Sequence, residues 1–208
     1  MRNPSGHPLV AATLDFTMRP LQRLRSKVVP RAAGHVLEIG VGTGLNAALY
    51  DPTRVLDLVG IEPDPHMLRR ATPRYDALRS TSDGIAVELL QVGAEALPFE
   101  ADRFDAIVVT FVLCTIPCVE DALREMHRVL APDGVLHFAE HTRSDHRVMA
   151  GLQDLLNPVW GVFAGGCHLN RDALALLGDA GFALGEVHGH GRGPLGLTPV
   201  HRGTARKA

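Results

Sequence analysis

Residues 36–46 decide the fold, and they read VLEIGVGTGLN. The apolar run from Val36 to Ile39 leads directly into glycines at positions 40, 42 and 44. A short apolar run without polar alternation is typical of a buried parallel strand. The glycines behind it allow a tight turn and a close approach of the backbone to a ligand. The segment therefore predicts the first strand of a doubly wound α/β fold, with a ligand at its carboxyl end.

Strand and helix patterns alternate along the rest of the chain. Apolar runs predict further strands at 55–61, 86–92, 104–110 and 135–139, and a closing pair at 182–188 and 198–205. Helical spacing predicts helices at 11–29 with an interruption at Pro20, and at 43–50, 65–77, 119–130, 152–160 and 171–180. This alternation predicts a mostly parallel sheet of seven strands. The closing pair has no helix between its strands, so we expect it to be antiparallel, and we expect one domain over residues 1–208.

Composition narrows the function classes. The chain has 208 residues, of which 46% are hydrophobic, and a formal net charge of −2. A chain with this charge lacks the excess of basic residues that binds nucleic acid, so no nucleic-acid partner is expected. The longest uncharged runs, 106–119 and 155–170, are shorter than a membrane span, so no integral membrane contact is expected. Three cysteines and a polar start of the chain favour a cytoplasmic protein. The oligomeric state stays open.

An acid follows the second predicted strand. Glu62 comes 20 residues after Gly42, where a carboxylate can accept hydrogen bonds from both ribose hydroxyls of an adenosine. The G-x-G-x-x-G pattern of nicotinamide dinucleotide sites fails here, because Leu45 stands where its third glycine belongs. The spacing therefore predicts an adenosine site of another kind.

Residues 37–44 resemble the first motif of the class I S-adenosylmethionine (SAM)-dependent methyltransferases with a type 11 methyltransferase domain. The likeness continues through GAEALPF at 93–99, FDAIV at 104–108 and RVLAPDGVL at 128–136, where Asp133 replaces a customary glycine. Segments at 44–50, 113–116, 138–141, 157–160 and 166–171 look like the alkyl-thiol methyltransferase-like subfamily and its bacterial relatives. The resemblance implies SAM as cofactor and S-adenosylhomocysteine as its product.

The resemblance also implies which residues hold the cofactor. The three glycines are expected to border its methionine and ribose parts, Glu38 to brace the glycine loop, and Glu62 to bind the ribose. Many members carry Asp where Gly93 stands, so the backbone of Ala94 or the carboxylate of Glu95 is expected to meet the adenine. The complete set of expected cofactor-binding residues is Glu38, Gly40, Gly42, Gly44, Asn46, Glu62, Pro63, Met67, Gly93, Ala94, Glu95, Thr110 and Val112.

Histidines supply the candidates for catalysis. His141 directly follows the predicted strand 135–139, at the edge of the sheet where ligands bind, and is our candidate general base. A role in capping a loop is the alternative. His168 is a second candidate for the base. Trp160, Phe163 and Phe111 are expected either to wall the acceptor pocket or to pack in the core.

The cysteines raise the question of a metal. Cys114 and Cys118 are four residues apart, and Cys167 and His168 are adjacent. Zinc sites commonly show the C-x₂₋₄-C spacing twice, and a second pair of that kind is missing here. No metal is therefore expected, and Cys114 and Cys118 are interpreted as small buried apolar residues.

Together these observations predict a SAM-dependent methyltransferase that acts on a small, apolar molecule, with a thiol as the acceptor. The alternatives are carbon or nitrogen methylation of a quinone, a phospholipid or another secondary metabolite, and a non-catalytic SAM-binding module. Residues 1–30 are expected to form a helical lid over the site.

Overall fold

The computed structural model describes residues 6–80, 85–192 and 198–208. Seven strands form one sheet in the order β3-β2-β1-β4-β5-β7-β6. The strands are β1 (Gly34–Ile39), β2 (Val55–Ile61), β3 (Ala86–Leu90), β4 (Phe104–Thr110), β5 (Leu130–His141), β6 (Phe182–Arg192) and β7 (Pro199–Lys207). The α-helices are α1 (Pro8–Met18), α2 (Gln22–Arg25), α3 (Pro65–Arg79), α4 (Val119–Val129), α5 (Arg147–Phe163) and α6 (Ala173–Asp179).

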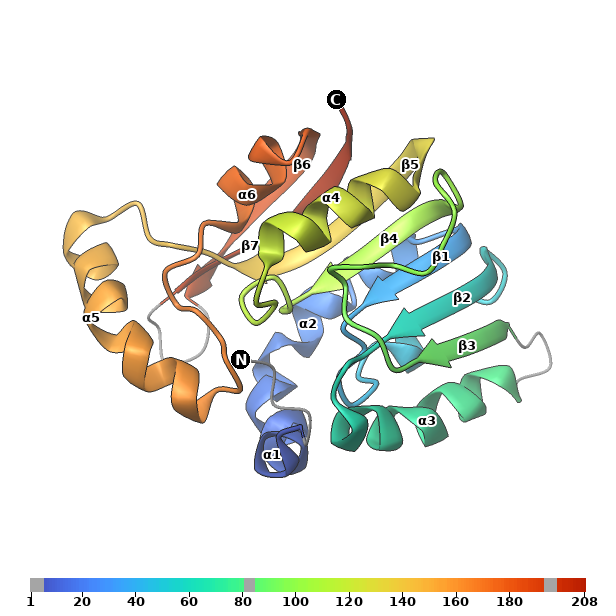
Figure 1. The fold of residues 1–208 in the computed structure, drawn as a ribbon, viewed down its shortest axis with the longest axis horizontal. Helices are drawn as coiled ribbons and strands as arrows, with labels where there is room; N and C mark the ends of the chain where they lie inside the picture. Colours follow the sequence, from blue (N-terminus) through green and yellow to red (C-terminus); the bar gives the residue numbers. More distant parts are fainter. Residues whose placement is uncertain (1–5, 81–84, 193–197) are drawn as a thin grey trace.

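The pairing of the strands confirms the doubly wound fold. β1 pairs in parallel with β2 on one side and with β4 on the other, so the strand order reverses at this point. β7 is antiparallel both to β5 and to β6, which confirms the predicted antiparallel closing pair. In open sheets of this kind, ligands bind beyond the carboxyl ends of the strands at the reversal. Figure 1 shows α1, α2 and α5 at that end of the sheet.

Each face of the sheet has its own apolar core. Leu37 and Ile39 of β1 pack on the face that α4 and α6 cover. Val36 belongs to the other face, together with Tyr75 and other residues of α3. This period of two follows from the pleat of the strand, and burial on both faces explains why the run 36–39 shows no regular polar alternation.

Two predicted helices differ from the structure. The helix expected at 43–50 is wrong, because the chain turns there and forms only a short 3₁₀ helix, η3 (Ala47–Leu49). Gly44 has φ +86°, and a Cβ there would lie 3.0 Å from Cα of Ala71, so the turn packs directly on α3. The helix expected at 11–29 is divided by the 3₁₀ helices η1 (Arg19–Leu21) and η2 (Val29–Arg31), the first of which holds Pro20.

One strand and one helix are longer in the structure than the sequence predicts. β5 begins at Leu130 rather than at 135, and α5 spans Arg147–Phe163 rather than 152–160. The sequence also predicts a glycine-rich loop at 190–196 between the closing strands, and this loop lies largely outside the described residues. Among the helices that the structure describes, none has the length and apolar character needed to cross a membrane.

Candidate active site

The glycine turn after β1 is tied to Glu62 at the end of β2. Gly40, Gly42 and Gly44 have φ values of +66°, +55° and +86°, which side chains rarely adopt. The amide of Gly42 donates a hydrogen bond of 2.9 Å to Oε2 of Glu62. The amide of Asp64 donates one of 2.9 Å to Oε1 of the same carboxylate. The two features that predicted an adenosine site therefore lie together where the strand order reverses.

Burial sets the charge state of Glu62. It raises the pKa of this carboxyl to about 7, although the hydrogen bonds from the amides of Asp64 and Gly42 act in the opposite direction. The group therefore changes its charge near neutral pH. A ligand that donates hydrogen bonds to the carboxylate favours the ionised form.

Glu38 braces the turn from inside the sheet. Its carboxylate accepts hydrogen bonds from Nδ2 of Asn46 at 2.8 Å, from the hydroxyl of Tyr50 at 2.7 Å and from the hydroxyl of Tyr75 at 2.5 Å. Burial raises the pKa of Glu38, and these three donors lower it. Glu38 thus binds the side chains of two residues, Asn46 and Tyr50, in the segment that follows the glycine turn.

Arg25 of α2 completes this buried network, and nothing in the sequence pattern identified it. Its Nη1 donates to Oδ1 of Asn46 at 3.0 Å and to Oγ1 of Thr110 at 2.7 Å. The guanidinium also lies 5.1 Å from the ring centre of Phe111. Burial lowers the pKa of Arg25, while the charge of Glu38 raises it. A cation in an N-terminal helix thus reaches the middle of the site.

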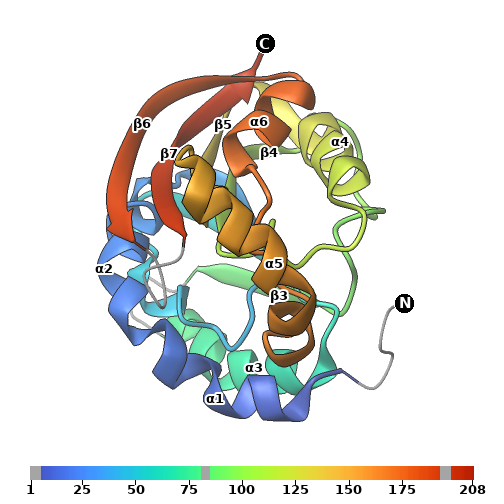
Figure 2. The same cartoon turned by 90° about the vertical axis from the view of Figure 1, so that its left-hand side faces the viewer.

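Helix α1 covers the glycine turn. Oδ1 of Asp15 accepts a hydrogen bond of 2.5 Å from the hydroxyl of Thr43, and Oδ2 pairs with Arg74 of α3 at 2.6 Å. A Cβ on Gly42 would lie 3.5 Å from Cδ2 of Leu14, so this leucine sits over the turn. Figure 2 shows α1 running beside α3 at this end of the molecule.

The loop after β4 meets the glycine turn from the other side. A Cβ on Gly40 would lie only 2.4 Å from Cγ2 of Val112. Phe111 has φ +56°, an uncommon value for a residue with a side chain. Oε1 of Glu140, on β5, accepts hydrogen bonds from the amides of Val112 at 2.7 Å and Leu113 at 3.2 Å. The segment expected to line the cofactor is therefore held firmly in place.

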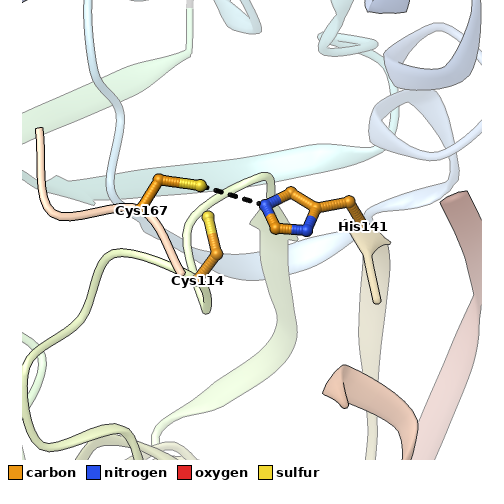
Figure 3. Close-up of side chains that lie close together, drawn as sticks. All are labelled: Cys114, His141 and Cys167. Atoms are coloured by element: carbon orange, nitrogen blue, oxygen red, sulfur yellow. Dashed lines mark hydrogen bonds between the residues drawn. The ribbon is translucent and has the colours of Figure 1, made fainter. Parts of the chain in front are cut away.

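His141 stands beside two cysteines (Figure 3). Its Nε2 lies 3.2 Å from Sγ of Cys167, and the ligand atoms of Cys114, His141 and Cys167 all lie within 4.8 Å of one another. A hydrogen bond between the two cysteines, followed by one from His141, lowers the pKa of Cys167. The pKa of Cys114 is raised by that bond to Cys167 and by burial. Cys118 is exposed, which corrects its interpretation as a buried residue, because it lies at the surface end of the loop where α4 begins.

The other expected site residues are placed as follows. Asp64 caps α3 by accepting from the amides of His66 and Met67, and Met67 is half-buried in the first turn. Pro63 is exposed, and Gly93, Ala94 and Glu95 lie in the loop that follows β3. Phe163 is 78% exposed, so it does not pack in the core. It ends α5, and the helix turns it outward. Trp160 is half-buried, and Nδ1 of His168 faces Nδ2 of Asn157 at 3.4 Å.

Comparisons with known proteins identify relatives of this chain. A family described as "Methyltransferase domain" matches residues 37–138. The thiol S-methyltransferase TMT1B of Homo sapiens is 33% identical over 156 residues, which cover 73% of this chain and 62% of that protein. The ubiquinone/menaquinone biosynthesis C-methyltransferase UbiE of Pseudomonas syringae pv. tomato is 30% identical over 195 residues, which cover 83% of this chain and 73% of that protein. The chain spans 55% to 64% of the thiol S-methyltransferases it matches.

Solved structures share the fold. The S-adenosylmethionine-dependent methyltransferase from Mesorhizobium loti superposes with a TM-score of 0.64 at 19% identity, covering 92% of this chain and 98% of that one. The [4+2]-cyclase SpnF has a TM-score of 0.69 at 20% identity, covering 90% of this chain and 80% of that one. The sequence matches to the methyltransferase domain and to the 30% identical C-methyltransferase show that the chain belongs to the family of SAM-dependent methyltransferases.

Proposed function

We propose that this protein transfers the methyl group of SAM to the sulfur of a small, apolar thiol. One observation carries the cofactor part of the proposal: the carboxylate of Glu62 is held 2.9 Å from the amide of Gly42, in a turn whose three glycines all have positive φ. The likeness to the thiol S-methyltransferases suggests a thiol as the acceptor. Membership of the family by itself gives methyl transfer from SAM and leaves the acceptor open.

Methyl transfer depends more on the alignment of the reacting atoms than on stabilising a new charge. The sulfur of the acceptor forms a bond to the methyl carbon while the bond from that carbon to the sulfonium sulfur breaks, and the cofactor leaves as a neutral thioether. Positive charge disperses along this path, so no oxyanion hole is required. Holding the reacting atoms in line is worth up to about 7–11 kcal/mol in favourable cases. In this proposal the glycine turn, Glu62, Thr110 and Val112 align the cofactor.

The acceptor approaches from the side of the loop after β4. There the cluster of Cys114, His141 and Cys167 is the nearest set of groups that can activate a thiol. His141 is buried and Cys167 is half-buried, so the cluster lies largely below the protein surface. A thiol is a poor nucleophile until it loses its proton, and a group that holds it as a thiolate accelerates attack. We assign that activation to His141, which acts as the base when the cluster holds no metal ion.

Apolar side chains on α1 and α5 support an apolar acceptor. The two helices approach each other near Gly165, where a Cβ would lie 3.5 Å from Cγ1 of Val10. Gly165 is two residues from Cys167 in the chain. The large apolar residues that these helices expose are Leu9, Phe16, Val148, Leu152, Leu155, Val159, Val162 and Phe163. Exposed apolar side chains on these two helices suit contact with apolar molecules.

Calorimetric titration tests the cofactor site. We expect SAM and S-adenosylhomocysteine to bind the wild-type protein, and Glu62→Gln to weaken both by about 10- to 100-fold, since hydrogen bonds to a charged group are worth about 1.5–3 kcal/mol. Glu120→Gln, at an exposed acid in the first turn of α4, is the matched control and keeps full affinity. Wild-type protein that binds neither compound at millimolar concentration would falsify the proposal.

A screen with radiolabelled SAM tests the acceptor. Apolar alkyl thiols, primary amines and quinols are offered at equal concentration, and the labelled product is identified by its retention against a synthetic standard. We expect label in the thioether. Label in a quinol or an amine instead would replace the thiol by the carbon or nitrogen chemistry of other relatives, and SAM binding without turnover of any class would favour a non-catalytic module.

A further inference from the structure

We propose that Cys114, His141 and Cys167 bind a zinc ion through three protein ligands, and that the fourth position takes the acceptor thiol. The second half of this inference rests on the proposed thiol acceptor, and the first half does not. Sequence spacing argued against a metal because a second cysteine pair is missing. The fold supplies the third ligand from a different place, because His141 ends β5 while Cys114 follows β4 and Cys167 precedes α6.

The ligand atoms have the spacing that zinc requires. Zinc is tetrahedral, with Zn–S of about 2.3 Å and Zn–N of about 2.0–2.1 Å, which separates neighbouring ligand atoms by about 3.5–3.8 Å. Here the three atoms lie within 4.8 Å of one another, and Nε2 of His141 lies 3.2 Å from Sγ of Cys167. Adjustments of about 1 Å or less in side-chain position therefore bring the cluster to zinc geometry. Figure 3 shows both sulfur atoms on the Nε2 side of the imidazole.

The backbone around the ligands is fixed by hydrogen bonds. The amide of His168 donates to the carbonyl of Cys114 at 2.9 Å, which joins the two cysteine loops. Nη1 of Arg171 donates to the carbonyls of Leu113 and Ile116, each at 2.6 Å, and so secures the loop on both sides of Cys114. A metal site needs ligands that are held in place before the ion arrives.

Unpartnered polar atoms also gather here. Nδ1 of His141 and Oε2 of Glu140 are buried and have no hydrogen-bond partner among the described residues, and the side chain of Trp160 reaches Cys167. An ion on Nε2 of His141 would contact neither of the two unpartnered atoms, so the case for zinc comes from the ligand atoms themselves. Two thiolates and one imidazole form a donor set that suits zinc, whereas magnesium and calcium prefer oxygen ligands.

Three protein ligands leave one position open, which is the arrangement of catalytic zinc sites. Cys114 lies two residues beyond Val112, and Val112 packs on Gly40 of the glycine turn, so the cluster adjoins the segment expected to line the cofactor. The proposal places the open position on that side. A thiol R–SH that binds there releases its proton to water, and the bound thiolate attacks the methyl carbon as the sulfonium bond breaks. The products are R–S–CH₃, S-adenosylhomocysteine and one proton. A metal-bound Nε2 has no lone pair left, so His141 then acts as a ligand and not as a general base.

The first experiment measures metal binding without reference to activity. Protein reduced with a phosphine and freed of metal is titrated with Zn²⁺ against a chromogenic chelator, and with Co²⁺ followed by absorption. We expect one ion per chain and the intense visible bands of tetrahedral Co²⁺ with sulfur ligands. Cys114→Ser, Cys167→Ser and His141→Gln are expected to weaken Zn²⁺ binding by about 100-fold or more. Cys118→Ser, at the exposed cysteine of the same loop, is the matched control and keeps wild-type affinity.

The second experiment addresses the open position. Butanethiol is added to the Co²⁺-loaded wild-type protein, and a new sulfur-to-cobalt charge-transfer band is expected. Bound Co²⁺ with no change on adding butanethiol overturns the placement of the thiol and leaves the metal site standing. Wild-type protein that takes up neither ion overturns the metal site itself, even if it methylates butanethiol. Failure of the proposed function is seen separately, as absence of methyl transfer to any thiol in protein that holds zinc.

Discussion

Nη1 of Arg25 lies 2.7 Å from Oγ1 of Thr110, so a cation from the N-terminal helix α2 is buried against the end of β4. Its charge opposes those of Glu38 and Glu140, which are also buried. Removing one member of a buried charge network leaves the others uncompensated, at a cost of about 3–5 kcal/mol. We therefore expect Arg25→Met to lower the free energy of unfolding in urea by that amount. Arg23→Met, at an exposed arginine in the same helix, is expected to change it little, and equal stabilities of the two variants would contradict the network.

Asp15 holds α1 over the glycine turn, and its loss is expected to loosen this cover. Asp15→Ala removes the bonds to Thr43 and Arg74 at once. Because both contacts are partly exposed, we expect little change in global stability and a faster dissociation of SAM in stopped-flow fluorescence. Asp121→Ala breaks a similar exposed pair with Arg124 on α4 and serves as control. A dissociation rate that is the same in both variants would show that α1 does not act as a lid.

Replacing two glycines by alanine is expected to change the stability of the protein in opposite directions. Gly40→Ala forces a side chain into φ +66° and into contact with Val112, so we expect it to destabilise the protein and to weaken SAM binding. Gly151→Ala lies in α5 with nothing within 4 Å of the new Cβ, and it is expected to stabilise the protein by about 0.5–1 kcal/mol. Thermal unfolding of both variants checks the signs. A tolerated Gly40→Ala would mean that the turn is looser than described.

The affinity for SAM is expected to fall as the pH falls below about 7. The pKa of Glu62 is raised to about 7 by burial, and only the ionised carboxylate accepts from both ribose hydroxyls. One pH unit below that pKa, the dissociation constant is expected to be about tenfold larger. Calorimetry between pH 6 and 8 measures this slope, and Glu62→Gln should remove it. Because a raised carboxyl pKa stabilises the folded state as the pH falls from 7 towards 4.5, weaker binding at pH 6 is not caused by this group unfolding the protein.

His137 gives the protein a pH-dependent stability. Burial lowers the pKa of this imidazole from 6.5 to about 4, helped by the charge of Arg31. The unfolded state therefore binds the proton first, and the free energy of unfolding decreases as the pH falls from 6.5 towards 4. The lowered pKa corresponds to a loss of up to about 3 kcal/mol. We expect His137→Asn to flatten this dependence in urea titrations from pH 4.5 to 7.5. His146→Asn, at an exposed histidine, should keep the wild-type slope.

Local patterns were sufficient for most of the sheet. The strands at 55–61 and 104–110 have the predicted bounds, because an apolar run bounded by turn residues carries its own signal. The helix expected at 43–50 was wrong for a reason that lies outside the segment. Ala71 of α3 packs on Gly44, and Glu38 binds the side chains of Asn46 and Tyr50, so the segment turns around a buried carboxylate.

The sequence by itself determined the fold class, the glycine turn and the acid that faces it, because each depends on residue types at short and regular spacing. Only the tertiary structure revealed that Arg25 is buried next to the site and that Asp15 pairs with Arg74. It also showed that Cys114, His141 and Cys167 lie close together. Residues 114 and 167 are separated by a helix, a strand and a further helix, and their approach depends on how the loops after β4 and α5 pack against the end of β5. Contacts between residues so far apart in the chain produce no repeating sequence pattern. The cluster therefore could not be recognised before the fold was known.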